Sequence, residues 1–149
     1  MRSKAPLALM EQVIMVLVFA LAAALCLQVF AFSNQASRRN AAIDRAVTLC
    51  QTAAETLKAA GGDMAYAQEK AMAKLGGTVS QGMWYVCYDG DWNVVEDDGS
   101  SDVYRLMAHG RPASVDGLQL ANIWAIEVDS GEELFSMSVA WQEVGGSNG

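Results

Sequence analysis

The sequence has little of what most catalytic and metal sites require. Its 149 residues include one histidine, His109, and three cysteines. A single histidine removes the usual general base and most transition-metal sites, and three cysteines are too few for a disulfide scaffold. We find no nucleophile–base pair, no phosphate-binding glycine loop after a predicted strand and no histidine–cysteine cluster. We therefore expect a protein that is not an enzyme and that uses no cofactor or metal.

Basic residues are also scarce. Ten lysines and arginines stand against seventeen aspartates and glutamates, which gives a net charge of −7. Beyond Asn40 there are six basic and sixteen acidic residues. A nucleic-acid-binding surface must neutralise phosphates, and anionic lipid attracts basic residues. The composition therefore argues against nucleic acid as a partner and against a C-terminal part that lies flat on a membrane.

Proline and glycine are absent between Pro6 and Gly61, so nothing in this stretch is expected to break a helix. Its early part, residues 13–32, reads VIMVLVFALAAALCLQVFAF and carries no charge. At about 1.5 Å per residue, such a helix spans roughly 30 Å, the hydrocarbon thickness of a bilayer. A core helix of a small protein would need a polar face, which this segment lacks. It therefore predicts a transmembrane helix.

Three interpretations of this apolar segment differ in whether it is cleaved, carries a lipid or remains in the membrane. A cleaved signal peptide would be cut after Val29-Phe30-Ala31, and a lipoprotein would be anchored at Cys26. We favour a retained single-pass anchor, because the run is long for a signal peptide and Leu25 stands where a lipoprotein signal needs a small residue. Basic residues flank the segment on both sides and do not fix its orientation. The acidic C-terminal part favours a cytoplasmic N-terminus with the remainder of the chain outside.

The helix is expected to continue as an amphipathic segment over residues 33–60. Its apolar positions recur every three or four residues, as on one face of a helix. They are Ile43, Val47, Cys50, Ala54 and Leu57. Gly61-Gly62 is expected to end this helix, and Asp63 to cap a short helix over residues 64–75.

Beyond Gly82 the pattern changes to that of strands separated by turn residues. The predicted strands cover residues 84–88, 92–96, 103–109 and 118–128, and a fifth places Phe135, Met137, Val139 and Trp141 on one face. Asp89-Gly90 is a tight-turn signal between the first two, and the four tryptophans are interpreted as sheet core. A sheet with one apolar face must be covered, and the amphipathic half of the long helix is the obvious cover.

The predicted fold is therefore α+β, with a long N-terminal helix packed on an antiparallel sheet of four to five strands. No internal repeat is evident. The expected segments are a basic leader at 1–12, the transmembrane helix at 13–32, its amphipathic continuation at 33–60, an α+β globular domain at 61–144 and a flexible tail at 145–149.

Two acidic groups follow the first strand. Asp89, Asp91 and Asn93 have the one-three-five spacing of a calcium loop, but Val94 stands where such a loop needs glycine. We interpret these three as turn residues without metal. The second group, interpreted as a solvated acidic loop, is Glu96, Asp97, Asp98 and Asp102.

Cys50 and Cys87 form a candidate disulfide if the globular domain is exported. The alternative is two buried free thiols that behave as small apolar residues. Cys26, inside the apolar run, is interpreted as a small apolar residue of the membrane helix.

At this point the chain resembles the type IV pilins and the pseudopilins of type II secretion systems. Arg2 and Lys4 look like the basic leader of that family, and Leu7-Ala8-Leu9-Met10-Glu11 is similar to the apolar residues and acid of its N-terminal methylation motif. The resemblance covers the whole chain in architecture and residues 2–32 in sequence. Where the family's leader peptidase requires a glycine, this chain has Pro6, which puts cleavage by the prepilin peptidase in question.

The resemblance implies roles for residues of the helix. Glu11 would pair with the free amine of a neighbouring subunit and so set the register between packed helices. The helix-packing positions would be Val13, Val16, Leu17, Ala20 and Ala24. The implied partners are the membrane, other pilin-like subunits, an assembly platform and a prepilin peptidase.

The first functional hypothesis is therefore a structural subunit of a type IV pilus or a secretion pseudopilus, located in the cell membrane or in a surface filament. The second is an uncleaved, single-pass, membrane-anchored extracytoplasmic binding module that does not polymerise. The third is a secreted soluble domain released after Ala31.

Overall fold

The computed structural model describes residues 5–99 and 101–143 of the chain. Its first element, α1, is a single α-helix of 56 residues from Ala5 to Ala60. The chain divides into two compact units, of which the first ends at Ala41 and the second begins at Ala42. The leader residues Arg2 and Lys4 and the tail at 145–149 lie outside the described residues.

Within the described residues, the first unit consists of α1 alone. Pro6 lies in its first turn, where the missing backbone N–H has no intrahelical partner to lose. Neither proline nor glycine follows until Gly61, and the helix has no break before that point. The long helix predicted from this absence is confirmed.

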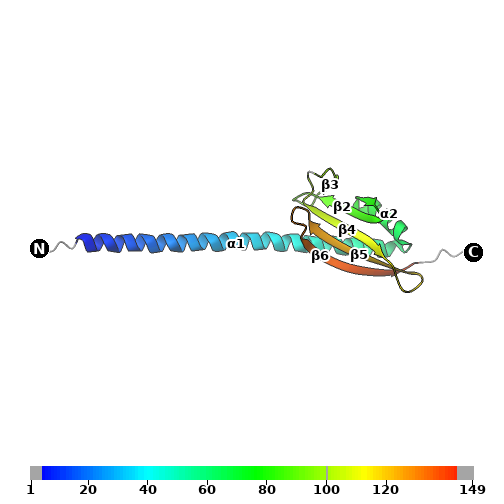
Figure 1. Cartoon of the computed structure of the whole chain (residues 1–149), viewed down its shortest axis with the longest axis horizontal. Coiled ribbons are helices and arrows are strands. Elements are labelled where there is room, and N and C mark those ends of the chain that lie inside the picture. Colours follow the sequence, from blue (N-terminus) through cyan, green and yellow to red (C-terminus); the bar gives the residue numbers. More distant parts are fainter. Residues whose placement is uncertain (1–4, 100, 144–149) are drawn as a thin grey trace, which may run out of the picture. The chain divides into compact units, whose positions relative to one another are not determined.

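The second unit contains the last part of α1, the short helix α2 (Met64–Leu75) and one antiparallel sheet (Figure 1). The strands are β1 (Thr78–Ser80), β2 (Met83–Tyr88), β3 (Val94–Val95), β4 (Tyr104–Arg111), β5 (Leu118–Glu127) and β6 (Glu133–Gln142). Their order in the sheet is β1-β2-β4-β5-β6, and β3 also pairs with β2. The predicted α+β fold is confirmed.

The sheet has six strands where four to five were expected. The additional strand is β1, which pairs Thr78 with Tyr85 and Ser80 with Met83. A strand of three residues is too short to show a period-two pattern, so the sequence did not reveal this strand. The predicted strand at 92–96 shrinks to β3, of which Val94 pairs with Tyr88.

One face of the sheet forms the core of the second unit. Trp84 and Val86 of β2, Leu106 of β4 and Ile123 of β5 are fully buried on this face. Phe135, Met137, Val139 and Trp141 of β6 also belong to this core, as the alternation predicts. Because side chains alternate along a strand, the residues between them form the outer face.

The helix presents mainly small side chains to this core. The buried residues of α1 are Ala42, Ala46, Cys50, Ala53, Ala54, Thr56 and Leu57. The predicted stripe is confirmed for Cys50, Ala54 and Leu57, whereas Ile43 and Val47 are only half-buried. The buried face is therefore rotated toward the alanines, which allow the helix to approach the sheet closely.

Two of the four tryptophans connect the sheet to the ends of the helices. The Trp84 indole N–H donates to the carbonyl of Gly76 over 3.0 Å, just after α2, and that of Trp141 donates to Gly62 over 2.8 Å, just after α1. These bonds satisfy carbonyls at the helix ends, which lack intrahelical partners. Both tryptophans are core residues, as predicted.

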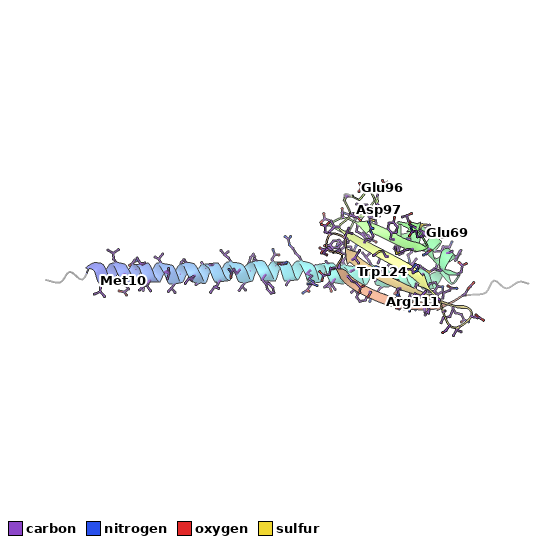
Figure 2. The ribbon with its side chains drawn as sticks, in the orientation of Figure 1. Met10, Glu69, Glu96, Asp97, Arg111 and Trp124 are labelled. Carbon is purple, nitrogen blue, oxygen red and sulfur yellow. The ribbon has the colours of Figure 1, made fainter. Side chains whose placement is uncertain are left out.

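The prediction is wrong for Trp124 and right only in part for Trp92. Trp124 lies between the core residues Ile123 and Ala125, so its side chain is on the outer face of the sheet, where Figure 2 labels it. Trp92 lies in the loop between β2 and β3 and not in a strand, but it is half-buried and packs against the core, where it stacks on Tyr104 with 4.0 Å between the ring centroids. Strand alternation defines two faces but does not say which of them is covered.

Candidate functional site

The apolar part of α1 is a candidate membrane and association surface. Among the described residues, α1 is the one helix that is long and apolar enough to cross a membrane, and its most apolar window has no buried residue. The exposed fractions of Val13, Leu17 and Phe30 are 60%, 59% and 72%. Exposed apolar area on this scale marks a protein or membrane contact.

The predicted assembly residues lie on two faces of this helix. Successive residues of an α-helix are rotated by about 100°, so Val13, Val16, Leu17, Ala20 and Ala24 fall on one side. Glu11, which is exposed, points roughly 180° away from the centre of that stripe. The structure therefore separates the proposed register residue from the proposed packing residues.

The candidate disulfide is not formed. Cys50 and Cys87 are both free and buried, and their thiols lie on opposite faces of the sheet. Cys50 belongs to the core between α1 and the sheet, whereas Cys87 alternates with the core residues Val86 and Tyr88 of β2. The alternative of two buried thiols is confirmed, and the disulfide prediction is wrong because strand alternation turns Cys87 away from the helix.

Burial also makes both thiols unreactive. Desolvation, helped by the charge of Glu133, raises the pKa of Cys50 to about 12. Desolvation likewise raises the pKa of Cys87, although the nearby Arg105 opposes it. Because the thiolate is the nucleophile and metal ligand, both side chains remain protonated and inert at neutral pH.

A charged cluster covers Cys87 on the outer face. The guanidinium of Arg105 pairs with Asp97 at 3.1 Å and with Asp102, and the Tyr85 hydroxyl donates to Asp97 over 2.8 Å. The candidate ligand atoms of Cys87, Asp97 and Asp102 lie within 4.8 Å of one another. Arg105 already supplies the positive charge that a metal ion would bring. The cluster therefore fixes the loop after β3 to strand β4.

The residues with calcium-like spacing build a loop instead. The Asp89 carboxylate accepts hydrogen bonds from the backbone N–H groups of Asp91 and Asn93, both at 2.9 Å, and from the Asn93 side-chain amide. These bonds, chiefly those from Asn93, hold the pKa of Asp89 below its usual value. The loop spans residues 89–93, so the predicted two-residue turn at Asp89-Gly90 is too short.

A groove between α1 and α2 was not predicted. Its volume is about 530 Å³, which is enough for side chains of a partner. Its lining residues are Thr56, Ala59, Ala60, Tyr66, Lys70, Ala73 and Lys74. The Lys70 ammonium lies 4.9 Å from the centre of the Tyr66 ring. The spacing of Tyr66, Lys70 and Lys74 by four residues was a signal in the sequence, but the groove itself depends on how the two helices pack.

No protein-family model, no curated protein and no solved structure matches this chain in the comparisons made.

Proposed function

We propose that this protein is a membrane-held structural subunit that associates with like subunits through the apolar part of α1, as in a type IV pilus or a secretion pseudopilus. The observation that carries the proposal is an apolar helix with no buried residue in its most apolar window, followed by a helical segment packed on a sheet. A helix of this kind needs lipid or other helices around it.

The two faces of the helix suit a bundle of several subunits. Ala20 and Ala24 form a small-xxx-small pair, which lets neighbouring helix backbones approach closely in a membrane. Glu11 on the other side is available to a different neighbour. An intramembrane carboxylate costs about 3 kcal/mol at the bilayer centre, so pairing it with an amine favours one register over others.

The proposed topology places the N-terminus in the cytoplasm and the acidic second unit outside the membrane. The second unit carries most of the carboxylates of the chain, and anionic lipid headgroups repel it. The proposed partners are the membrane, other pilin-like subunits, an assembly platform and a prepilin peptidase.

One observation favours a second candidate function, an uncleaved anchored module that binds an extracytoplasmic partner without polymerising. Pro6 stands at the position where the resemblance requires glycine, and its backbone is already part of α1. A restrained backbone that lacks an N–H is a poor peptidase substrate. Without cleavage, Glu11 has no free amine to pair with at the expected register.

The test combines two measurements on the full chain purified from membranes. Mass spectrometry of the mature N-terminus distinguishes cleavage at Pro6, an intact leader and cleavage after Ala31. Sedimentation equilibrium in density-matched micelles then measures self-association. We expect oligomers that Glu11→Lys weakens by roughly tenfold in dissociation constant, about 1.4 kcal/mol.

Glu55→Lys is the matched control, because Glu55 is an exposed carboxylate on the same helix but belongs to the second unit. It is expected to leave self-association unchanged. A wild-type chain that stays monomeric at every concentration and keeps its leader contradicts the structural-subunit proposal and favours the anchored module.

A further inference from the structure

The second unit is electrically polarised from one end of its sheet to the other. The loops that follow β2, β3 and β5 lie at one end, tied together by hydrogen bonds from Val103 to Tyr88 and from Val128 to Val103. Their carboxylates are Asp89, Asp91, Glu96, Asp97, Asp98, Asp102, Asp129 and Glu132. Figure 2 labels Glu96 and Asp97 at this end, with Glu69 and Arg111 at the other.

The groove between α1 and α2 begins at the opposite end, where α1 finishes at Ala60. Its floor is formed by Ala59 and Ala60 of α1, and the carbonyl of Gly62, just beyond, accepts the hydrogen bond of Trp141. Trp141 pairs with Gln119 at the start of β5, whereas the β5–β6 turn follows the last residue of β5, Glu127. Ten strand residues at about 3.3 Å each separate the two ends by roughly 30 Å.

The groove carries two lysines whose ammonium groups are not held in ion pairs within the described residues. Lys70 and Lys74 line it, both are exposed, and neither forms an ion pair with a residue in the part of the chain that the structure describes. Beyond Lys4, the lysines of the chain are Lys58, Lys70 and Lys74, all on α1 or α2. The groove is therefore a cationic, alanine-floored site on an acidic unit.

The β5–β6 turn at the other end is acidic, exposed and held in shape by its own hydrogen bonds. Gly131 N–H donates to the Glu127 carbonyl over 2.9 Å, and the Ser130 hydroxyl donates to the Glu127 carboxylate over 2.7 Å. The carboxylates of Asp129 and Glu133 are exposed on either side of these residues. A preorganised turn loses little conformational entropy when it docks.

We propose that the α1–α2 groove of one copy receives the acidic β5–β6 turn of a second copy. The two surfaces are complementary in charge and lie at opposite ends of the unit, so they cannot meet within one chain. Contacts that bring the acidic ends of two units together are repelled, which favours this pairing over them. Because the contact is heterologous, its repetition builds a ring or an open chain of subunits.

This inference rests on the proposed function and specifies how the second units of neighbouring subunits meet. The test uses a carbodiimide, which joins a carboxylate to an amine only where the two touch, on a mixture of unlabelled and ¹⁵N-labelled full chains in micelles. We expect mixed-isotope peptide pairs that link Lys70 or Lys74 to Asp129 or Glu133. Raising the salt concentration should weaken the linkage, because the contact is electrostatic.

Charge reversal provides the decisive comparison. Lys70→Glu with Lys74→Glu leaves the groove without an amine, and Asp129→Lys with Glu133→Lys leaves these two positions without a carboxylate, so neither double variant alone should form this linkage. Mixing the two double variants should restore it, now between groove glutamates and turn lysines. Lys58→Glu reverses one lysine on α1 outside this groove and should leave the yield unchanged.

Failure to restore the linkage in the mixture overturns the inference. So does wild-type self-association in the micelles without cross-links between these two surfaces, a result that leaves the proposed function standing. A chain that does not self-associate at all overturns both, and the sedimentation experiment identifies that outcome independently.

Discussion

Two glycines on either side of β1 allow a sharp test of how the second unit is packed. Gly77 and Gly82 both have positive φ, +83° and +78°. An alanine at either position takes the left-handed backbone penalty of about 1–2 kcal/mol. A Cβ at Gly82 meets nothing within 4 Å, whereas one at Gly77 would lie 2.2 Å from the carbonyl oxygen of Tyr85 and 2.7 Å from the Cγ2 of Val86.

The backbone carbonyl of Tyr85 cannot rotate away, because it belongs to the central part of β2. We expect Gly82→Ala to lower the free energy of unfolding by about 1–2 kcal/mol and Gly77→Ala by roughly 4 kcal/mol or more. Urea unfolding of the full chain in micelles, followed by tryptophan fluorescence, measures both. Equal losses for the two variants would refute the close approach of residue 77 to β2.

Three further predictions concern the core and the loops. Leu57→Ala removes a fully buried side chain and should cost about 2–5 kcal/mol of unfolding free energy, while the exposed Lys58→Ala should cost little. Hydrogen bonds from Asn93 lower the pKa of Asp89, so they stabilise the loop above the pKa of the unfolded carboxyl. That stabilisation is lost as pH falls through the folded-state pKa, and an NMR titration of Asn93→Ala should show the Asp89 pKa rising. Burial raises the pKa of Cys50 to about 12. The stabilisation that comes from burying the neutral thiol is therefore complete at neutral pH, and it is lost as the pH rises from the ordinary thiol range toward 12. Urea unfolding across that range should show a decline that Cys50→Ala flattens.

Much of the fold could be predicted because local chemistry determines it. The absence of proline and glycine before Gly61 predicts one long helix, and Asp63 caps α2 as expected, accepting the N–H of Tyr66 over 2.8 Å. The alternation of Phe135, Met137, Val139 and Trp141 correctly gives one face of β6. Such signals depend on neighbours in sequence, and no tertiary contact overrides them here.

The remainder depends on contacts that no local pattern contains. Alanine suits either side of a helix, so the sequence could not show that the buried face of α1 is centred on Ala46 and Ala53 and not on Ile43 and Val47. Arg105 meets its carboxylates only once β4 and the loop after β3 are in place. The lysine groove likewise requires the packing of α2 beside α1.

The alanine-lined face of α1 has a consequence for how this sequence can change. Where two layers meet through small side chains, an added methylene forces them apart and costs roughly 1–3 kcal/mol, whereas large core residues can be exchanged for others of similar volume. We therefore expect substitutions by larger residues to be poorly tolerated at Ala46, Ala53 and Ala54. Sequence changes in the core are expected mainly in the sheet, where Leu106 and Ile123 can be replaced by apolar residues of similar volume if their neighbours change shape to match.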